Sequence, residues 1–146
     1  MKKIARSAIV PHSAEAMYAL VEDIESYPQF LPWCRAVRVE RSGTTTLAEL
    51  QVGLHGLRQS FSTQNDNQPG RAIDMKLVTG PFRRFSAAWR FTPLDERACK
   101  VEYSMQLEFS SRTLARLLEP LFETIANSMV EAFSRRADAL HGLHPG

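Results

Sequence analysis

Apolar and polar side chains alternate along most of the chain, with the two-residue period of a β-strand that buries one face. The alternating stretches cover residues 3–10, 36–41, 48–54, 57–63, 73–77, 85–91 and 101–109. Turn signals separate them at Ser42-Gly43, Gly56, residues 65–67 (Asn-Asp-Asn), Pro69-Gly70 and Gly80-Pro81. Strands that follow one another at such short spacing predict an antiparallel sheet.

Two stretches show the period of an amphipathic helix instead. The first follows Ser13, a favourable N-cap, and we expect it to end at Pro28. The second covers residues 114–140 and contains Pro120, where we expect a kink or a break between a short helix and the main one. The proline-bounded segment 27–34 between helix and sheet has room only for a short helical turn. An antiparallel sheet covered by one long C-terminal helix predicts an α+β fold, with a cavity between the layers.

Composition adds limits to this picture. The chain has 146 residues, 44% of them hydrophobic and 23% charged, which is typical of one globular domain over residues 1–146. It excludes a disordered chain, a collagen-like repeat and a membrane bundle. The net charge of +2 argues against DNA as a partner. Cys34 and Cys99 are too few for a disulfide scaffold, so we expect reduced thiols in a soluble, cytoplasmic protein.

The search for catalytic or metal chemistry gives no site. His141 and His144 are three residues apart, but they lie in the tail without a third ligand nearby. A Cys34–His55 dyad would lack a third group to orient it. No G-x-S-x-G motif and no glycine-rich phosphate loop is present. We therefore predict no catalytic residues, no metal and no required cofactor.

The informative residues are apolar and aromatic, and they fall at element junctions or on the inward faces of strands and helix. They predict a hydrophobic pocket, gated at the junctions, although packing in a solid core is the competing interpretation of each residue. The residues expected to line the pocket are Phe30, Leu31, Trp33, Met75, Pro81, Phe82, Trp89, Tyr103, Met105, Leu121, Ile125 and Met129. Phe82 with Arg83 and Arg84 would suit contact with the anionic inner face of a membrane, and a solvated turn is the alternative.

The motifs resemble those of the polyketide cyclase/coenzyme Q-binding family of START-like, helix-grip proteins, which includes ribosome association toxins and mitochondrial coenzyme Q-binding proteins. The most specific stretch is 27–34 (Tyr-Pro-Gln-Phe-Leu-Pro-Trp-Cys). A similar stretch precedes it at 13–17. Others follow it in order at 52–58, 77–83, 89–94, 108–109 and 129–133. The resemblance implies a β-α-α-β6-α order, a curved sheet that grips the last helix, and a hydrophobic tunnel for a quinone or another polyisoprenoid lipid.

Three functions are compatible with this resemblance. The favoured one is non-catalytic binding and transport of ubiquinone or another polyisoprenoid lipid in support of respiratory electron transport. The second is a ribosome association toxin that blocks 70S assembly through the large subunit. A basic stripe of Arg35, Arg38 and Arg41 would help it, although a solvated strand face is the favoured interpretation of the stripe. A polyketide or oligoketide cyclase is the weakest, because no acid/base constellation supports it.

Overall fold

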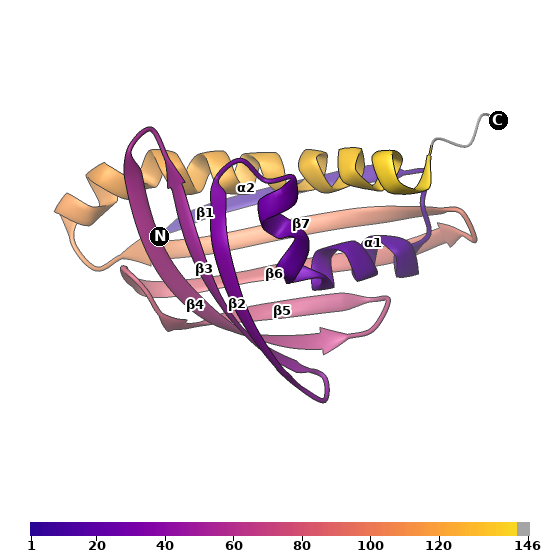
Figure 1. Cartoon of the computed structure of the whole chain (residues 1–146), viewed down its shortest axis with the longest axis horizontal. Helices are drawn as coiled ribbons and strands as arrows, with labels where there is room; N and C mark the ends of the chain where they lie inside the picture. Colours follow the sequence, from indigo (N-terminus) through magenta and orange to yellow (C-terminus); the bar gives the residue numbers. More distant parts are fainter. Residues whose placement is uncertain (143–146) are drawn as a thin grey trace.

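The computed structural model describes residues 1–142, which form a curved seven-stranded antiparallel sheet and a long C-terminal helix (Figure 1). The elements are β1 (Lys2–Val10), α1 (Ala14–Glu22), the 3-10 helix η1 (Ile24–Gln29), β2 (Cys34–Ser42), β3 (Thr45–Leu54), β4 (Leu57–Gln68), β5 (Ala72–Thr79), β6 (Phe82–Asp95), β7 (Ala98–Phe109) and α2 (Arg112–His141). The strand order is β1-β7-β6-β5-β4-β3-β2, and every neighbouring pair is antiparallel. This arrangement confirms the predicted α+β helix-grip fold.

The core lies between one face of the sheet and α2. On β7 every second side chain from Val101 to Phe109 is buried, as a half-buried strand requires. The buried side chains of α2 recur every three or four residues from Leu118 to Ala137. The helix packs along β1 and β7, while α1 lies against α2, β6 and β7, and η1 lies on β2 (Figure 1). The two short helices therefore extend the cover over the sheet from α2 to β6 and β2.

The β3–β4 hairpin has a two-residue turn at His55 and Gly56, whose φ angles are 53° and 83°. Positive φ at both positions is what a tight hairpin turn requires. Just before it, a Cβ on Gly53 would lie 2.4 Å from the carbonyl oxygen of Leu57. Only glycine therefore allows the two strands to approach this closely.

Two helix boundaries differ from the prediction. The helix α1 ends at Glu22 rather than at Pro28, because Asp23 leaves helical geometry and the chain continues as η1. Pro28 lies inside η1, whose φ range suits proline. The helix α2 continues through Pro120 as one element, with no separate short helix before it. Pro120 and Arg116 are both exposed, so water can reach the carbonyl that proline leaves without a donor.

The turn predicted at residues 65–67 is also wrong. These residues belong to β4, and the chain turns at Pro69 and Gly70 instead. Asn65 is buried on the inner face of β4, where it bonds with Thr63. Pairing with β3 and β5 on either side overrides the local turn preference of the three polar residues.

Candidate ligand cavity

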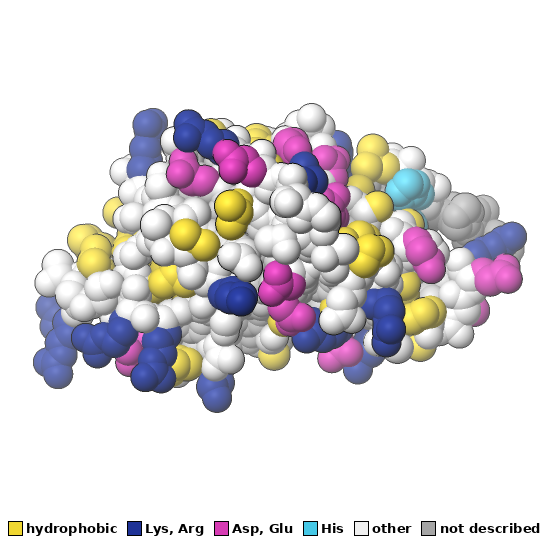
Figure 2. All heavy atoms as spheres, turned by 90° about the horizontal axis from the view of Figure 1, so that it is seen from below, with side chains coloured by type: hydrophobic (Ala, Val, Ile, Leu, Met, Phe, Trp, Pro, Cys, Tyr) yellow, Lys and Arg dark blue, Asp and Glu magenta, His cyan; other side chains and the backbone are white. Residues whose placement is uncertain are grey.

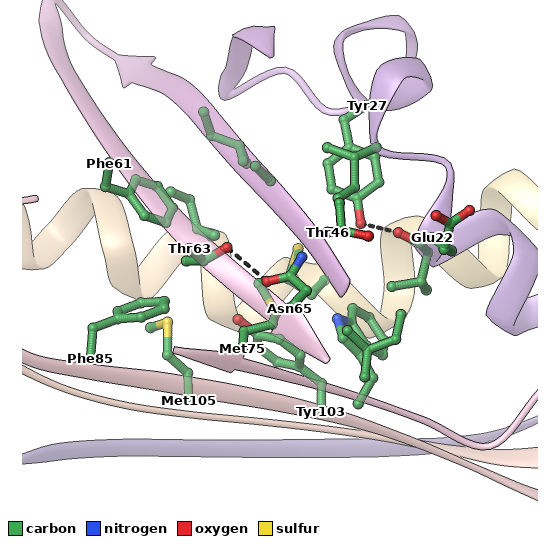
Figure 3. Close-up of a pocket in the computed structure, with 18 of the residues that line it drawn as sticks. Glu22, Tyr27, Thr46, Phe61, Thr63, Asn65, Met75, Phe85, Tyr103 and Met105 are labelled. Carbon is green, nitrogen blue, oxygen red and sulfur yellow. Dashed lines mark hydrogen bonds between the residues drawn. The ribbon is translucent and has the colours of Figure 1, made fainter. Parts of the chain in front are cut away.

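A mostly apolar cavity lies between the inner face of the sheet and α2, with α1 and η1 at one end (Figure 3). The helix α2 contributes Phe122, Ile125 and Met129 to its wall, and the sheet contributes Met75 and Met105 among others. The cavity has a volume of about 40 Å³, which is space for a few waters rather than for a lipid tail. Because three of the lining residues are methionines, whose unbranched side chains adapt readily, this wall can change shape around a guest.

Polar side chains interrupt the apolar wall on β3 and β4. Thr46 comes from β3, and Thr63, Asn65 and Asn67 come from β4. The hydroxyl of Thr63 donates to Oδ1 of Asn65 at 2.8 Å, and Nδ2 of Asn67 donates to Oγ1 of Thr46 at 2.9 Å. These bonds allow polar groups to stay at buried positions without losing all their partners.

Two tyrosines and one glutamate are the ionisable side chains on this wall. Burial raises the pKa of Tyr27 and Tyr103, so both remain neutral phenols at physiological pH. The Tyr27 hydroxyl donates to the carbonyl of Val21, which fastens η1 to α1. The Glu22 carboxylate accepts from Nε of Arg41 at 2.6 Å. None of these groups forms a nucleophile–base pair.

Of the residues predicted to line a pocket, seven lie on this cavity. They are Trp33, Met75, Trp89, Tyr103, Met105, Ile125 and Met129. Leu121 is buried in the core but does not contact the cavity. Whether a ligand contacts these side chains stays a prediction.

The junction 30–33, between η1 and β2, borders a groove on the surface of the protein. Phe30, Leu31 and Trp33 line a groove of the surface together with residues of α2. The guanidinium of Arg136 stands 5.0 Å from the centre of the Phe30 ring. Trp33 lines both the groove and the cavity, so this residue lies between the two.

The second predicted gate, at Pro81 and Phe82, is not a gate in this structure. Phe82 is buried, and its ring lies 5.0–6.0 Å from those of four other phenylalanines. They are Phe61, Phe85, Phe109 and Phe122. Pro81 is half-buried and does not line the cavity. The position of Phe82 at a junction after Gly80-Pro81 suggests a gate, but it does not show that other rings surround this side chain.

The burial of Phe82 also removes this side chain from the predicted membrane contact, because it is not available at the surface. Arg83 and Arg84 are exposed. Arg83 shares a surface hollow with Arg112, at the end where α2 begins. In the view of Figure 2, lysine and arginine side chains gather toward that end of the molecule.

The three arginines of the predicted stripe differ in their contacts. Arg41 bonds with Glu22 and Glu25 across the gap to α1 and η1. Arg35 and Arg38 are exposed, and neither forms an ion pair within residues 1–142. Only part of the stripe is therefore free to meet a polyanion.

The other candidates stay apart from the cavity. Cys34 is buried, burial raises the pKa of its thiol to about 11, and His55 is exposed in the hairpin turn. His141 ends α2 with its ring 6.1 Å from that of His12, and His144 lies outside the described residues. In the described part of the chain, no three His, Cys, Asp or Glu side chains cluster as metal ligands would. No helix described there has the length and apolar character to cross a bilayer.

The polar part of the wall was missed at the sequence level. The alternation that includes Phe61 continues through Thr63 and Asn65, so extending it by one step would have placed Asn65 inside. The Asn-Asp-Asn run at residues 65–67 favours a turn locally, which hides this alternation. Thr46 gave no signal, because a lone threonine suits either face of a strand.

Comparison with known proteins shows which family and which relatives this chain is similar to. Residues 10–134 match the protein family described as polyketide cyclase/dehydrase and lipid transport. The ribosome association toxin RatA of Vibrio cholerae is 43% identical over 143 residues, covering 97% of this chain and 99% of the toxin. The coenzyme Q-binding protein COQ10 homolog B of Xenopus laevis is 28% identical over 144 residues, covering 94% of this chain and 59% of that protein.

The fold recurs in a solved structure, the Zhui aromatase/cyclase from Streptomyces sp. R1128. It superposes with a TM-score of 0.84 at 17% identity, covering 94% of this chain and 93% of the enzyme. At that identity the likeness concerns the fold alone. The sheet, the gripped helix and the match over residues 10–134 together show that the chain belongs to the polyketide cyclase/dehydrase and lipid transport family.

Proposed function

We propose that the protein binds and carries a hydrophobic small molecule, ubiquinone or another polyisoprenoid lipid, without converting it, in support of respiratory electron transport. The observation that carries this proposal is the apolar cavity between the sheet and α2. The description of the family as one of lipid transport supports it, as does the name of the coenzyme Q-binding relative. The neutral tyrosines on the wall favour binding over acid/base chemistry.

The affinity would come mainly from the burial of the tail. Each buried CH₂ contributes about 0.8 kcal/mol, so a few isoprene units give useful affinity with few polar contacts. A guest of that size needs more room than about 40 Å³. Met75, Met105 and Met129 can supply part of it by changing rotamer. Trp33, between the groove and the cavity, is the side chain whose movement would join the two.

Ligand extraction and titration test the proposal. Organic extracts of the purified protein are analysed by mass spectrometry, and short-chain ubiquinone is titrated while tryptophan fluorescence is recorded. Both tryptophans of the chain line the cavity, so their emission reports directly on a guest. Ala48→Leu, which fills the wall, should abolish uptake, whereas Ala36→Leu on the exposed side of β2 should not. An extract without lipid, together with no quinone uptake, would refute the proposal.

The second candidate function is interference with ribosome association, and the specific observation that favours it is the similarity to RatA over nearly the whole of both chains. Arg35, Arg38 and Arg58 are exposed and form no ion pair within the described residues. They could contact ribosomal RNA of the large subunit.

Sucrose-gradient sedimentation of ribosomes decides this second candidate. Added protein should reduce the 70S peak, and Arg35→Glu or Arg58→Glu, each made alone, should partly restore it. Arg90→Glu, at an arginine already bonded to Asp74, serves as the charge-matched control. An unchanged 70S peak at low salt would exclude this function while leaving the carrier proposal intact.

A further inference from the structure

We propose that the ligand of this cavity carries a neutral oxygen that accepts a hydrogen bond, such as a ketone or quinone carbonyl, and that Asn65 is the residue that selects it. This inference rests on the proposed carrier function, because it names the chemistry of a guest in the same cavity. It goes further by assigning the polar contact to one side chain and by excluding anionic lipids.

The orientation of the Asn65 amide is the first step. Its Oδ1 accepts from the hydroxyl of Thr63 at 2.8 Å, and the Thr63 side chain is fully buried. With Oδ1 held on that side, the Nδ2 group is turned away from Thr63. Figure 3 shows it pointing toward the side of the cavity where Thr46 lies. The cavity is therefore presented with a donor, not with an acceptor.

The second step is that this donor lacks a protein partner. Asn65 is 3% exposed and lines the cavity, and within residues 1–142 its Nδ2 donates no hydrogen bond to another side chain or to the backbone. The indole N–H of Trp33, on the same wall, is also buried without a partner. Buried amide groups are nearly always paired, with protein atoms, water or a ligand. A ligand oxygen on the cavity side would complete the pairing at a place that the protein already fixes.

The charge of the cavity wall decides whether the ligand oxygen can belong to a carboxylate or must be neutral. Among the described residues the wall contains no Lys, Arg or His, whereas Glu22 contributes a carboxylate. A fatty acid would place a second carboxylate in this wall without a counter-ion, and burial of an unpaired charge is strongly unfavourable. Arg41 lies outside the wall and is already bonded to Glu22 and Glu25. A ketone or quinone carbonyl needs only a donor, which Asn65 supplies.

Three small probes separate these effects. Hexylbenzene is purely apolar, hexanophenone replaces one CH₂ by a carbonyl, and 4-pentylbenzoate carries a carboxylate. Each is titrated into the full chain, and tryptophan fluorescence gives the dissociation constant. In the unmodified protein at pH 7, hexanophenone should bind at least tenfold more tightly than 4-pentylbenzoate.

The variants then isolate the hydrogen bond. Asn65→Leu should weaken hexanophenone about fivefold to tenfold, as expected for one lost hydrogen bond, and leave hexylbenzene within about twofold. Thr63→Val, which frees the amide to rotate, should weaken hexanophenone in the same direction and serves as the test should Asn65→Leu fail to fold. Met75→Leu, an apolar change in the same wall, should move both neutral probes together.

The outcomes distinguish the two proposals. If neither neutral probe binds the unmodified protein, the carrier function fails and this inference fails with it. If both bind, but Asn65→Leu and Thr63→Val weaken them equally or not at all, only the role of Asn65 is refuted. Binding of 4-pentylbenzoate as tight as that of hexanophenone would likewise refute the selection against anions.

Discussion

Replacement of Phe133 by alanine should remove the contact that joins α2 to η1. The Phe133 side chain is fully buried, and its ring centre lies 5.2 Å from that of Tyr27, 5.1 Å from Phe30 and 5.4 Å from Trp89. Loss of a buried phenylalanine ring costs about 3–5 kcal/mol, because transfer free energy and packing are lost together. Each edge-to-face pair contributes about 0.5–1.5 kcal/mol beyond burial, which favours the upper part of that range.

Urea denaturation followed by far-UV circular dichroism measures this loss. Phe133→Ala should lower the free energy of unfolding by about 4 kcal/mol, a large share of the roughly 5–15 kcal/mol that holds a typical domain. Leu117→Ala, on the same helix at a position 52% exposed, should change it by less than about 0.5 kcal/mol. Amide exchange in η1 should also accelerate in Phe133→Ala, since Tyr27 and Phe30 lose their common partner.

The reasoning is refuted if Phe133→Ala costs less than about 1 kcal/mol, because a fully buried ring with three aromatic neighbours cannot then be structural. A large loss of stability without faster exchange in η1 would refute the second part alone. In that case the ring would stabilise the core without holding η1 in place.

Gly53→Ala should lower the melting temperature, since the new Cβ would meet a backbone carbonyl oxygen of β4 at 2.4 Å, and an unchanged melting curve would contradict this. Burial raises the pKa of the Cys34 and Cys99 thiols from 9.0 to about 11. The unfolded thiols therefore ionise first, so stability should fall between pH 9 and 11, and Cys34→Ala with Cys99→Ala should flatten that part of a stability–pH profile. Arg83 and Arg84 should support binding to vesicles containing phosphatidylserine, and Arg83→Glu with Arg84→Glu should abolish it in a flotation assay at low salt; equal flotation of both proteins would exclude this surface.

Periodicity was enough for the layers of the fold, because alternation on a strand and recurrence on a helix both report burial of one face. It located β7 and α2 within a few residues. It did not predict that Pro28 lies within η1, and the break that it allowed at Pro120 does not occur, since the effect of a proline depends on the face where it lies and on the geometry of the neighbouring residues. Asn65 shows a second limit, because its turn preference is local while its burial comes from pairing with neighbouring strands.

The candidate cavity was predictable only in part. Met75, Trp89, Tyr103 and Met105 are expected from strand alternation once the sheet face is known. Phe82 falls outside this alternation, because the register of β6 shifts between Phe82 and Arg84, and it packs among other aromatic rings. Which inward side chains touch one another and which border a space depends on sheet curvature and helix placement. The periodicity of the sequence contains no information about sheet curvature or helix placement.

The strand order leaves β1 and β2 as the two open edges of the sheet. An open edge presents unpaired backbone groups that can pair with another copy of the chain, and charged side chains at an edge oppose such pairing. The edge β2 carries Arg38 and Glu40 at exposed positions, and β1 begins with Lys2 and Lys3. Whatever else they contact, these charges protect the sheet against edge-to-edge aggregation. Substitutions that neutralise them therefore belong in aggregation assays as well as in binding assays.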